Sequence, residues 1–423
     1  MDGNRYELNE VGNIGLNQIY KMYETYRNAG YAKLIQKMEC DRIYEDAQGY
    51  WLKDVEGNVY LDFLGGFGAF NIGHNHPKVH EALEYIKNRP NLVHIGLNPY
   101  EAVLANNLAS LTDGKLTRSF FCNGGAETVE SALKLARVAT GRKKLLYCTN
   151  SYHGKTFAAL SVTGHNRFKH YVEPLVPECE QVLFGDIDSL EEKLRDKKAA
   201  AFLLEAIQGE GGVIEPPESY LYEVRKLCTK YETLMILDEI QTGLGRTGKM
   251  FAYEHEEIVP DILCLAKSLG GGMIPIGAYL TTEQIYQRAY GDIDKCMMDS
   301  STFGGNTYAC AAAIATIEVL LKEELPRKAK ETGDYLKARL LEIKEKYDDI
   351  KDVRGKGLLI GIEFYENTEK NATFTASRLI KKYRILTAYS PNNPNMIRLE
   401  PPLHITRNQV DTFIHALNDI LKD

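Results

Sequence analysis

The chain has 423 residues, a net charge of −7 and eight cysteines. This length exceeds what one hydrophobic core usually supports, so two or more lobes are expected. The negative charge, together with the lack of any basic run interleaved with aromatic residues, argues against broad affinity for nucleic acid. The cysteines show no CxxC spacing and no signal peptide is apparent, which predicts reduced thiols in a cytoplasmic protein and neither a disulfide nor a zinc framework. No apolar stretch reaches the length that spans a membrane.

The N-terminal part of the chain, residues 1–48, is polar and contains several tyrosines. It is predicted to form a helical arm that lies on the small domain or on a partner subunit. The next segment, Trp51–Phe63, alternates in the way that is typical of a β-hairpin. In the GHNHP stretch, His74 and His76 are interpreted as part of a turn before a helix that starts near Pro77, and not as a metal site.

Strands and helices alternate from this hairpin to about Leu321, which predicts a large α/β domain. The remainder is predicted to form a smaller α/β lobe, with helices at Lys328–Lys346 and Thr373–Lys382 and a strand at Gly357–Phe364. The predicted division is an N-terminal arm with part of the small domain, a large domain and a C-terminal small domain, at residues 1–48, 49–322 and 323–423.

A glycine pair lies between an apolar strand and a helical pattern in the stretch FFCNGGAE, residues 120–127. The helix is predicted over Thr128–Val138. Free backbone N–H groups at a helix start bind phosphate well, although an ordinary turn has the same sequence pattern. Farther along, Tyr152 follows a predicted strand at Lys144–Cys148 and offers a ring that could stack on a flat cofactor or belong to the core.

Two short apolar runs end in opposite charges. Leu234–Leu237 precedes Asp238, and Ile262–Ala266 precedes Lys267. Both runs fit strands buried on two faces of a parallel sheet, and ligands bind at the carboxyl edge of such sheets. A lysine there can form a Schiff base, and a neighbouring aspartate can keep a pyridinium nitrogen protonated, as pyridoxal phosphate requires. A structural ion pair beside a glycine-rich turn is the other interpretation.

Several longer motifs resemble the class III aminotransferases, a family with the fold type I of pyridoxal-phosphate enzymes. The resemblance extends from about Tyr50 to Thr406 and is carried by LDEIQTGLGRTGKMFAYEH, AKSLGGG, LEAIQGEGGV and STFGGNT. It implies an α/β fold: a large domain with a mainly parallel seven-stranded sheet flanked by helices, plus a small α/β domain. It also implies pyridoxal 5′-phosphate as the cofactor, with no metal.

The resemblance assigns roles to matching residues around the cofactor. Lys267 would bind it as a Schiff base and shuttle a proton, Asp238 would pair with the ring nitrogen, and Gln241 would lie near the ring's phenolic oxygen. Backbone N–H groups of Gly125 and Ala126 would bind the phosphate.

Further residues complete the implied cofactor site. Thr302 of a neighbouring subunit would reach the same phosphate, which implies a homodimer or a larger assembly. Tyr152 would stack on the ring with His153 beside it, and Glu205 would support the cofactor end of the site. The chain departs from the usual family pattern at Gly124, where Ser is common, and at Ala206, where Pro is common.

Three residues concern the substrate. Arg398 matches an arginine that binds a substrate carboxylate, and Glu210 matches an acid that covers this arginine when the amine has no nearby carboxylate. Ornithine aminotransferases resemble this chain around two further positions, but they carry a tyrosine and an arginine where this chain has Phe67 and Lys155. This difference argues against ornithine as the substrate. Phe67, with Phe70, instead suggests an apolar passage for a methylene chain.

Within the family, longer stretches, among them FLGGFGAFNIGHNHPKV and GKLTRSFFCNGGAETVESALKLA, are most similar to bacterial putrescine aminotransferases. The expected reaction is therefore a ping-pong transamination from a diamine such as putrescine or cadaverine to 2-oxoglutarate. Ornithine, acetylornithine and 4-aminobutyrate are alternative donors. An aminomutase or a decarboxylating transaminase is an alternative on the same scaffold.

Overall fold

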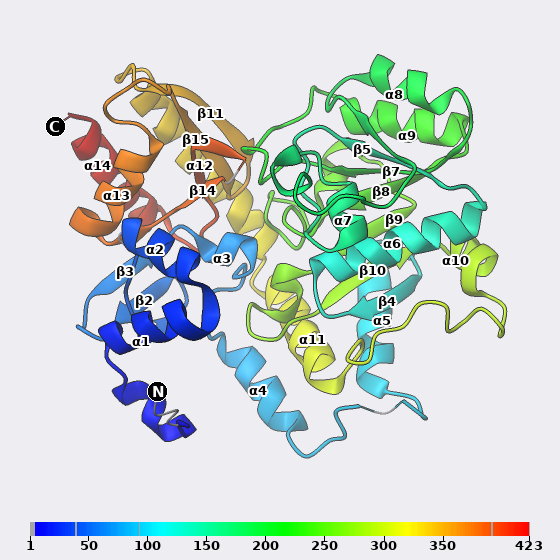
Figure 1. Cartoon of the computed structure of the whole chain (residues 1–423), viewed down its shortest axis with the longest axis horizontal. Helices are drawn as coiled ribbons and strands as arrows, with labels where there is room; N and C mark the ends of the chain where they lie inside the picture. Colours follow the sequence, from blue (N-terminus) through cyan, green and yellow to red (C-terminus); the bar gives the residue numbers. More distant parts are fainter. Residues whose placement is uncertain (1–4, 39, 93, 391, 423) are drawn as a thin grey trace.

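The computed structural model describes residues 5–38, 40–92, 94–390 and 392–422. Within this part of the chain, a seven-stranded sheet occupies one side of the molecule (Figure 1). In spatial order its strands are β4 (Arg118–Cys122), β10 (Gly277–Thr281), β9 (Ile262–Leu265), β8 (Leu234–Asp238), β7 (Ala199–Glu205), β5 (Lys144–Cys148) and β6 (Cys179–Val182). Neighbouring strands are parallel, except that β10 is antiparallel to β4 and β9. The predicted mainly parallel sheet of seven strands is thereby confirmed.

The central strands are apolar along their whole length because both faces of the sheet are covered. Leu204, Leu237 and Leu265 pack into one hydrophobic cluster. Their chain neighbours Leu203 and Ile236 pack into a second cluster on the other face. Successive side chains of a strand point to opposite faces, so a strand between two layers of helices needs apolar residues at every position.

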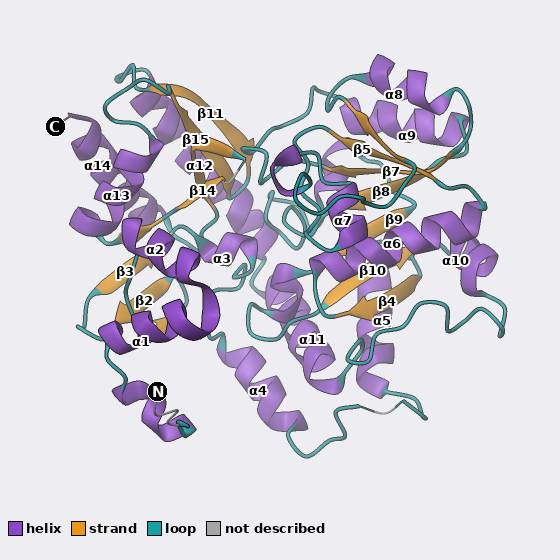
Figure 2. Ribbon diagram, in the orientation of Figure 1, coloured by secondary structure: helices purple, strands orange, loops and turns teal. Residues whose placement is uncertain are grey.

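Helices lie on both faces of this sheet (Figure 2). The helices of this part of the chain are α5 (Pro99–Leu111), α6 (Gly125–Thr140), α7 (Phe157–Ser161), α8 (Ile187–Leu194), α9 (Tyr220–Lys230), α10 (Glu283–Tyr290) and α11 (Thr307–Lys322). A further helix, α4 (Pro77–Ile86), packs on α11 and lies away from the sheet. Proline opens α4 and α5, where its missing N–H and fixed φ suit the first helical turn. None of the helices in the described part of the chain combines the length and the apolar character that crossing a bilayer requires.

Two four-stranded sheets also form within the described residues. One has the order β1 (Tyr44–Gln48), β2 (Trp51–Asp54), β3 (Val59–Asp62) and β13 (Ile385–Leu386). The other has the order β11 (Ile350–Lys356), β12 (Leu359–Phe364), β15 (Asn393–Leu399) and β14 (Ala388–Ser390). The remaining helices are α1 (Leu16–Met22), α2 (Ala29–Lys37), α3 (Gly65–Gly68), α12 (Leu325–Lys344), α13 (Ala372–Tyr383) and α14 (Arg407–Lys422).

The hairpin expected at Trp51–Phe63 is present, since β2 and β3 pair antiparallel. Its second strand also pairs in parallel with β13, so the hairpin shares a sheet with the C-terminal segment. Figure 1 shows both grouped with α13 and α14, away from the seven-stranded sheet. The division at residues 49 and 323 stays a prediction. The pairing of β3 with β13 bears on its first boundary, because that division places the hairpin in the large domain.

Candidate active site

Asp238 and Lys267 follow neighbouring parallel strands. Asp238 ends β8 and is paired in register with Cys264 of β9. Lys267 opens a short 3-10 turn that ends at Gly270, directly after β9. Because the two strands are parallel, both residues lie at the carboxyl edge of the sheet, where the sequence places them.

The carboxylate of Asp238 is buried and held from two sides. Its Oδ2 lies 2.7 Å from Nδ1 of His153, and its Oδ1 accepts a hydrogen bond of 3.0 Å from the backbone N–H of Ile240. The other ring nitrogen of His153, Nε2, is buried and has no partner among the described atoms. These contacts fix the carboxylate in one orientation.

Lys267 is partly buried and donates a hydrogen bond of 2.8 Å from Nζ to the backbone carbonyl of Phe67. Gln241 donates to the same carbonyl at 3.3 Å. The carbonyl reaches this position because α3 is a left-handed turn, with φ near 58° at Gly66 and 57° at Phe67. Desolvation lowers the pKa of Lys267, and the negative charges of Glu400 and Glu210 oppose this shift only in part.

The start of α6 has the features of an anion site. Gly124 precedes it, and no side chain caps its first turn. Gly154 lies against this start: a Cβ there would be only 2.6 Å from the Cβ of Ala126. The first N–H groups of an α-helix lack partners within the helix, so those of Gly125 and Ala126 are suited to a phosphate.

Thr302 lies in an exposed loop next to this helix start. Its neighbour Ser301 donates a hydrogen bond of 2.6 Å to Glu127 in the first turn of α6. The expected contact of Thr302 with a partner subunit's cofactor stays a prediction.

Glu205 ends β7 and is paired in register with Asp238. It accepts hydrogen bonds from the backbone N–H groups of Tyr152, at 2.8 Å, and Gly209, at 3.2 Å. Burial raises the pKa of Glu205 to about 7. Burial and the nearby charge of Glu210 likewise raise the pKa of the half-buried Tyr152. Tyr152, His153, Glu205 and Asp238 therefore form one connected group, and their roles toward the cofactor stay predictions.

Arg398 comes from the other side of the molecule, near the end of β15. Its Nη2 lies 2.8 Å from Oε1 of Glu210, and its Nε lies 2.8 Å from Oε2 of Glu400. The Phe67 ring covers the guanidinium at 5.6 Å. Burial opposes the charge on Arg398, but attraction to Glu400 and Glu210 holds its pKa above the ordinary value.

Glu400 was not among the residues predicted for the site. It stands two positions after Arg398, and residues with that spacing share a face of an extended strand. This spacing was the available signal, but the carboxylate next to the PP dipeptide resembles an ordinary surface charge.

Two other residues from the sequence interpretation point elsewhere. The Nζ of Lys155 lies over the ring of Phe168, 4.4 Å from its centroid. The ring of Phe70 packs on His74, with 3.9 Å between the ring centroids. Phe67 alone of the two phenylalanines therefore meets Arg398.

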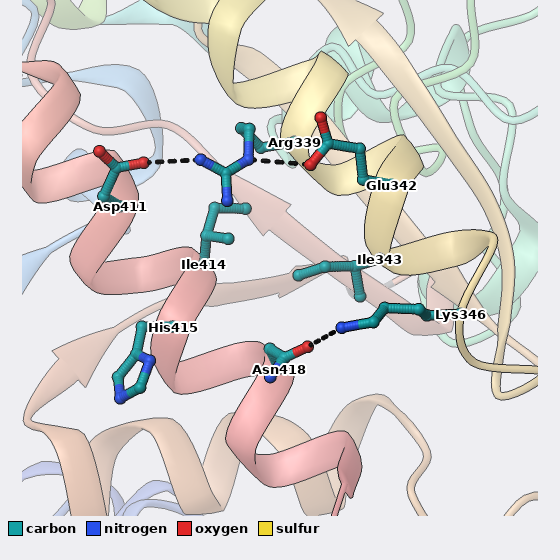
Figure 3. A pocket seen from close by; sticks show the side chains of 8 residues that line it. All are labelled: Arg339, Glu342, Ile343, Lys346, Asp411, Ile414, His415 and Asn418. Carbon is teal, nitrogen blue, oxygen red and sulfur yellow. Dashed lines mark hydrogen bonds and ion pairs between the residues drawn. The ribbon is translucent and has the colours of Figure 1, made fainter.

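A surface groove between α12 and α14 is separate from this group (Figure 3). Arg339 contacts the acids Glu342 and Asp411, and Lys346 donates to the neutral amide of Asn418, each contact measuring 3.1 Å. The charge of Arg339 is therefore neutralised within the groove, whereas Lys346 is held there by a neutral amide.

The residues at the sheet edge fit pyridoxal 5′-phosphate. The uncapped helix start suits its phosphate, the fixed carboxylate of Asp238 suits its ring nitrogen, and Lys267 is a primary amine of lowered pKa. The orphaned Nε2 of His153 beside Asp238 is a further polar group for which the described protein atoms offer no partner. Such a group of residues defines a Schiff-base enzyme of the pyridoxal-phosphate type.

Comparison with known proteins agrees with this class. The model of the family "Aminotransferase class-III" matches residues 34–421. An ornithine aminotransferase from Toxoplasma gondii ME49 superposes with a TM-score of 0.90 at 31% identity, over 99% of this chain and 99% of the other. An acetylornithine aminotransferase from Elizabethkingia anophelis superposes with a TM-score of 0.82 at 32% identity, over 97% of this chain and 99% of the other. A PLP-bound amine transaminase from an uncultivated Pseudomonas species superposes with a TM-score of 0.83 at 29% identity, over 90% of this chain and 94% of the other.

The chain belongs to the class III aminotransferases. It is therefore a pyridoxal-phosphate-dependent enzyme that takes the amino group from an amine donor and passes it to an oxo acid acceptor.

Proposed function

We propose that the amine donor is a terminal diamine such as putrescine or cadaverine and that 2-oxoglutarate is the acceptor. The observation that carries this proposal is the ion pair between Glu210 and Arg398. An arginine covered by an acid attracts a carboxylate less strongly, so an amine without a carboxylate can enter beside it. When Glu210 moves away, Arg398 can bind the carboxylate of the oxo acid.

The ring of Phe67 supports an apolar donor. It is 46% exposed although it lies beside the buried Arg398, so it presents an apolar surface next to the ion pair. Lys155, which stands where ornithine aminotransferases have an arginine, is held over Phe168. Both features favour a methylene chain over a second carboxylate.

We further propose the roles of the residues around the cofactor. When bound, pyridoxal phosphate supplies an electron sink for the carbon that carries the amino group. Lys267 would hold the cofactor through Nζ, and its free amine would serve as the base that moves the proton. Its lowered pKa favours the neutral amine that a base requires, and the Phe67 carbonyl gives Nζ a fixed hydrogen-bond partner.

The other proposed roles are those of positioning. Asp238 accepts a hydrogen bond from the ring nitrogen, and Gln241 lies near the phenolic oxygen. Tyr152 stacks on the ring beside His153, and Glu205 holds the backbone N–H of Tyr152. Gly125 and Ala126 bind the phosphate.

The second candidate donor is an amino acid. Ornithine and acetylornithine aminotransferases are among the similar structures, at 31% and 32% identity. In that case Arg398 would bind the carboxylate of the donor as well as that of the acceptor.

We also propose a homodimer in which Thr302 reaches the partner's cofactor. Ile95 and Leu97 are 99% and 98% exposed in the loop between α4 and α5. This loop lies beside the Thr302 loop, where the side-chain amide of Asn98 donates a hydrogen bond of 2.8 Å to the carbonyl of Gly305. Apolar side chains so exposed, next to Thr302, fit a contact with a second copy of the chain. Sedimentation of the purified protein tests the dimer. A cytoplasmic location remains a proposal from the cysteine content.

The first experiment mixes the purified holoenzyme with putrescine and follows the change of the cofactor from its aldehyde to its amine form by absorbance. The same measurement is then made with ornithine, 4-aminobutyrate and lysine. Conversion by diamines alone supports the proposal. Conversion only by an amino acid would refute the diamine donor while leaving the aminotransferase class intact, and repeated turnover that needs no added oxo acid would favour an aminomutase.

A further inference from the structure

Arg398 is contacted by two carboxylates, and they differ in how they are held. Glu210 belongs to a turn between Gln208 and Ile214, and its side chain is 14% exposed. Glu400 and Arg398 are both 0% exposed. Glu210 can therefore move toward solvent, whereas Glu400 has no such freedom.

The surroundings of Glu400 show why it stays in place. Its backbone N–H donates a hydrogen bond of 2.9 Å to the carbonyl of Phe63. A Cβ on Gly65 would lie 1.9 Å from the carbonyl oxygen of Glu400, and one on Gly68 would lie 2.9 Å from its Oε1. Glycines at these two positions let the turn of α3, which carries Phe67, close directly over Glu400.

A charge count around Arg398 then gives the consequence. With both carboxylates in place, the cluster of Arg398, Glu210 and Glu400 carries one net negative charge. When Glu210 leaves, Arg398 still has Glu400 beside it, and Glu400 also faces the buried Arg246 and Lys267. Arg398 is then partly neutralised and is not a free cation. Neither oxygen of Glu400 makes a hydrogen bond among the described atoms, so the pair is held by charge attraction at 2.8 Å.

We infer that Glu400 is a specificity-determining residue that acts through Arg398: it keeps the arginine partly neutralised when Glu210 moves, and so weakens the attraction of the site for a substrate carboxylate. This inference deepens the proposed function, on which its assignment to diamine donors rests. Arg398 keeps an unpartnered Nη1 for a carboxylate, so the acceptor can still bind, but less tightly than at an isolated arginine. Weak binding of carboxylates favours a donor that has none.

The test compares Glu400→Gln with the wild type in two measurements. One is the ratio of kcat/KM for 4-aminobutyrate to that for putrescine. The other is the calorimetric Kd of glutarate, a dicarboxylate that lacks the reactive oxo group. We expect the ratio to rise and the Kd to fall by about tenfold each, which corresponds to ~1.4 kcal/mol. Combining Glu400→Gln with Glu210→Gln should exceed the product of the single effects, because only the double variant leaves Arg398 without an acid.

The matched control is Asp261→Asn, which removes the acid from another ion pair with an arginine, Arg225, at 2.7 Å. It should leave both measurements unchanged. If Glu400→Gln does not fold, Glu400→Asp withdraws the charge by one methylene and should shift both measurements in the same direction by less. A folded Glu400 variant with an unchanged ratio and unchanged glutarate affinity would overturn the inference. Failure of the wild type to convert putrescine would instead refute the diamine proposal, while glutarate binding would still test Glu400.

Discussion

His153 and Asp238 are joined at the carboxyl edge of the central sheet, with 2.7 Å between Nδ1 and Oδ2, and both side chains are buried. The histidine comes from the segment after β5 and the aspartate from the end of β8. This contact orients the carboxylate that we assign to the ring nitrogen of the cofactor.

Asp238→Asn should lower kcat by roughly 100-fold or more, because a neutral amide cannot keep the ring nitrogen protonated. Steady-state kinetics of the cofactor-loaded variant measures this. The control is Asp261→Asn, since Asp261 pairs with Arg225 at 2.7 Å, before β9 begins, and should affect stability more than turnover. Equal losses of kcat in the two variants would contradict the assigned role.

Lys267→Arg should abolish transamination and covalent binding of the cofactor, because a guanidinium does not form the Schiff base. Borohydride reduction followed by mass spectrometry reports the covalent adduct directly. Lys155→Arg alters an exposed lysine and should retain the adduct. Persistence of the adduct in Lys267→Arg would assign the cofactor to another lysine.

Glu210→Ala should raise kcat/KM for 4-aminobutyrate relative to putrescine by several-fold, about 1 kcal/mol, because one of the two acids that neutralise Arg398 is removed. Competition between the two donors measures the selectivity. Glu218→Ala, an exposed acid of the same connection between β7 and α9, is the control. If Glu210→Ala kept the wild-type preference between 4-aminobutyrate and putrescine, the proposed movement of Glu210 would be refuted.

Glu205 should make stability depend on pH. Its pKa in the folded chain, about 7, lies above its ordinary value of 4.5, so the folded state binds more protons than the unfolded state between these values. Stability should therefore fall as pH rises through this window, at about 1.4 kcal/mol per pKa unit. Glu205→Gln lacks this dependence, so its Tm relative to wild type should be higher near pH 8 than near pH 5, measured on protein without cofactor. The same Tm difference at both values would contradict a raised pKa.

Gly68→Ala should destabilise the chain by roughly 1–3 kcal/mol. The glycine has φ of +83°, and the added Cβ would lie 2.9 Å from Glu400. Gly114→Ala separates the two causes, because Gly114 has φ of +69° but nothing within 4 Å of an added Cβ. Thermal denaturation should show a larger loss at Gly68 than at Gly114, and equal losses would mean that the contact with Glu400 adds nothing.

Much of the central sheet could be predicted because local sequence determines it. The runs before Asp238 and Lys267 are apolar at every position, and β8 and β9 lie where those runs predict them. The left-handed turn at Phe67 could not be predicted in this way, because a phenylalanine rarely adopts it and its reason lies in distant contacts. Its carbonyl meets Lys267 across 200 positions of sequence, and its ring meets Arg398. The burial of Glu400 is likewise set by the folded neighbours of β15, which its own sequence does not reveal.

Lys267 and Asp238 stand on the seven-stranded sheet, whereas Arg398 and Glu400 belong to β15 and the residue that follows it. The groups to which we assign the reaction and the groups to which we assign the choice of substrate thus lie on separate sheets of the protein. Mutations of Arg398 or Glu400 therefore act on the site from a second sheet, and they also reach Lys267, because the charge of Glu400 opposes the lowering of its pKa. This separation offers a route by which one ancestral transaminase could diversify into enzymes for different amines.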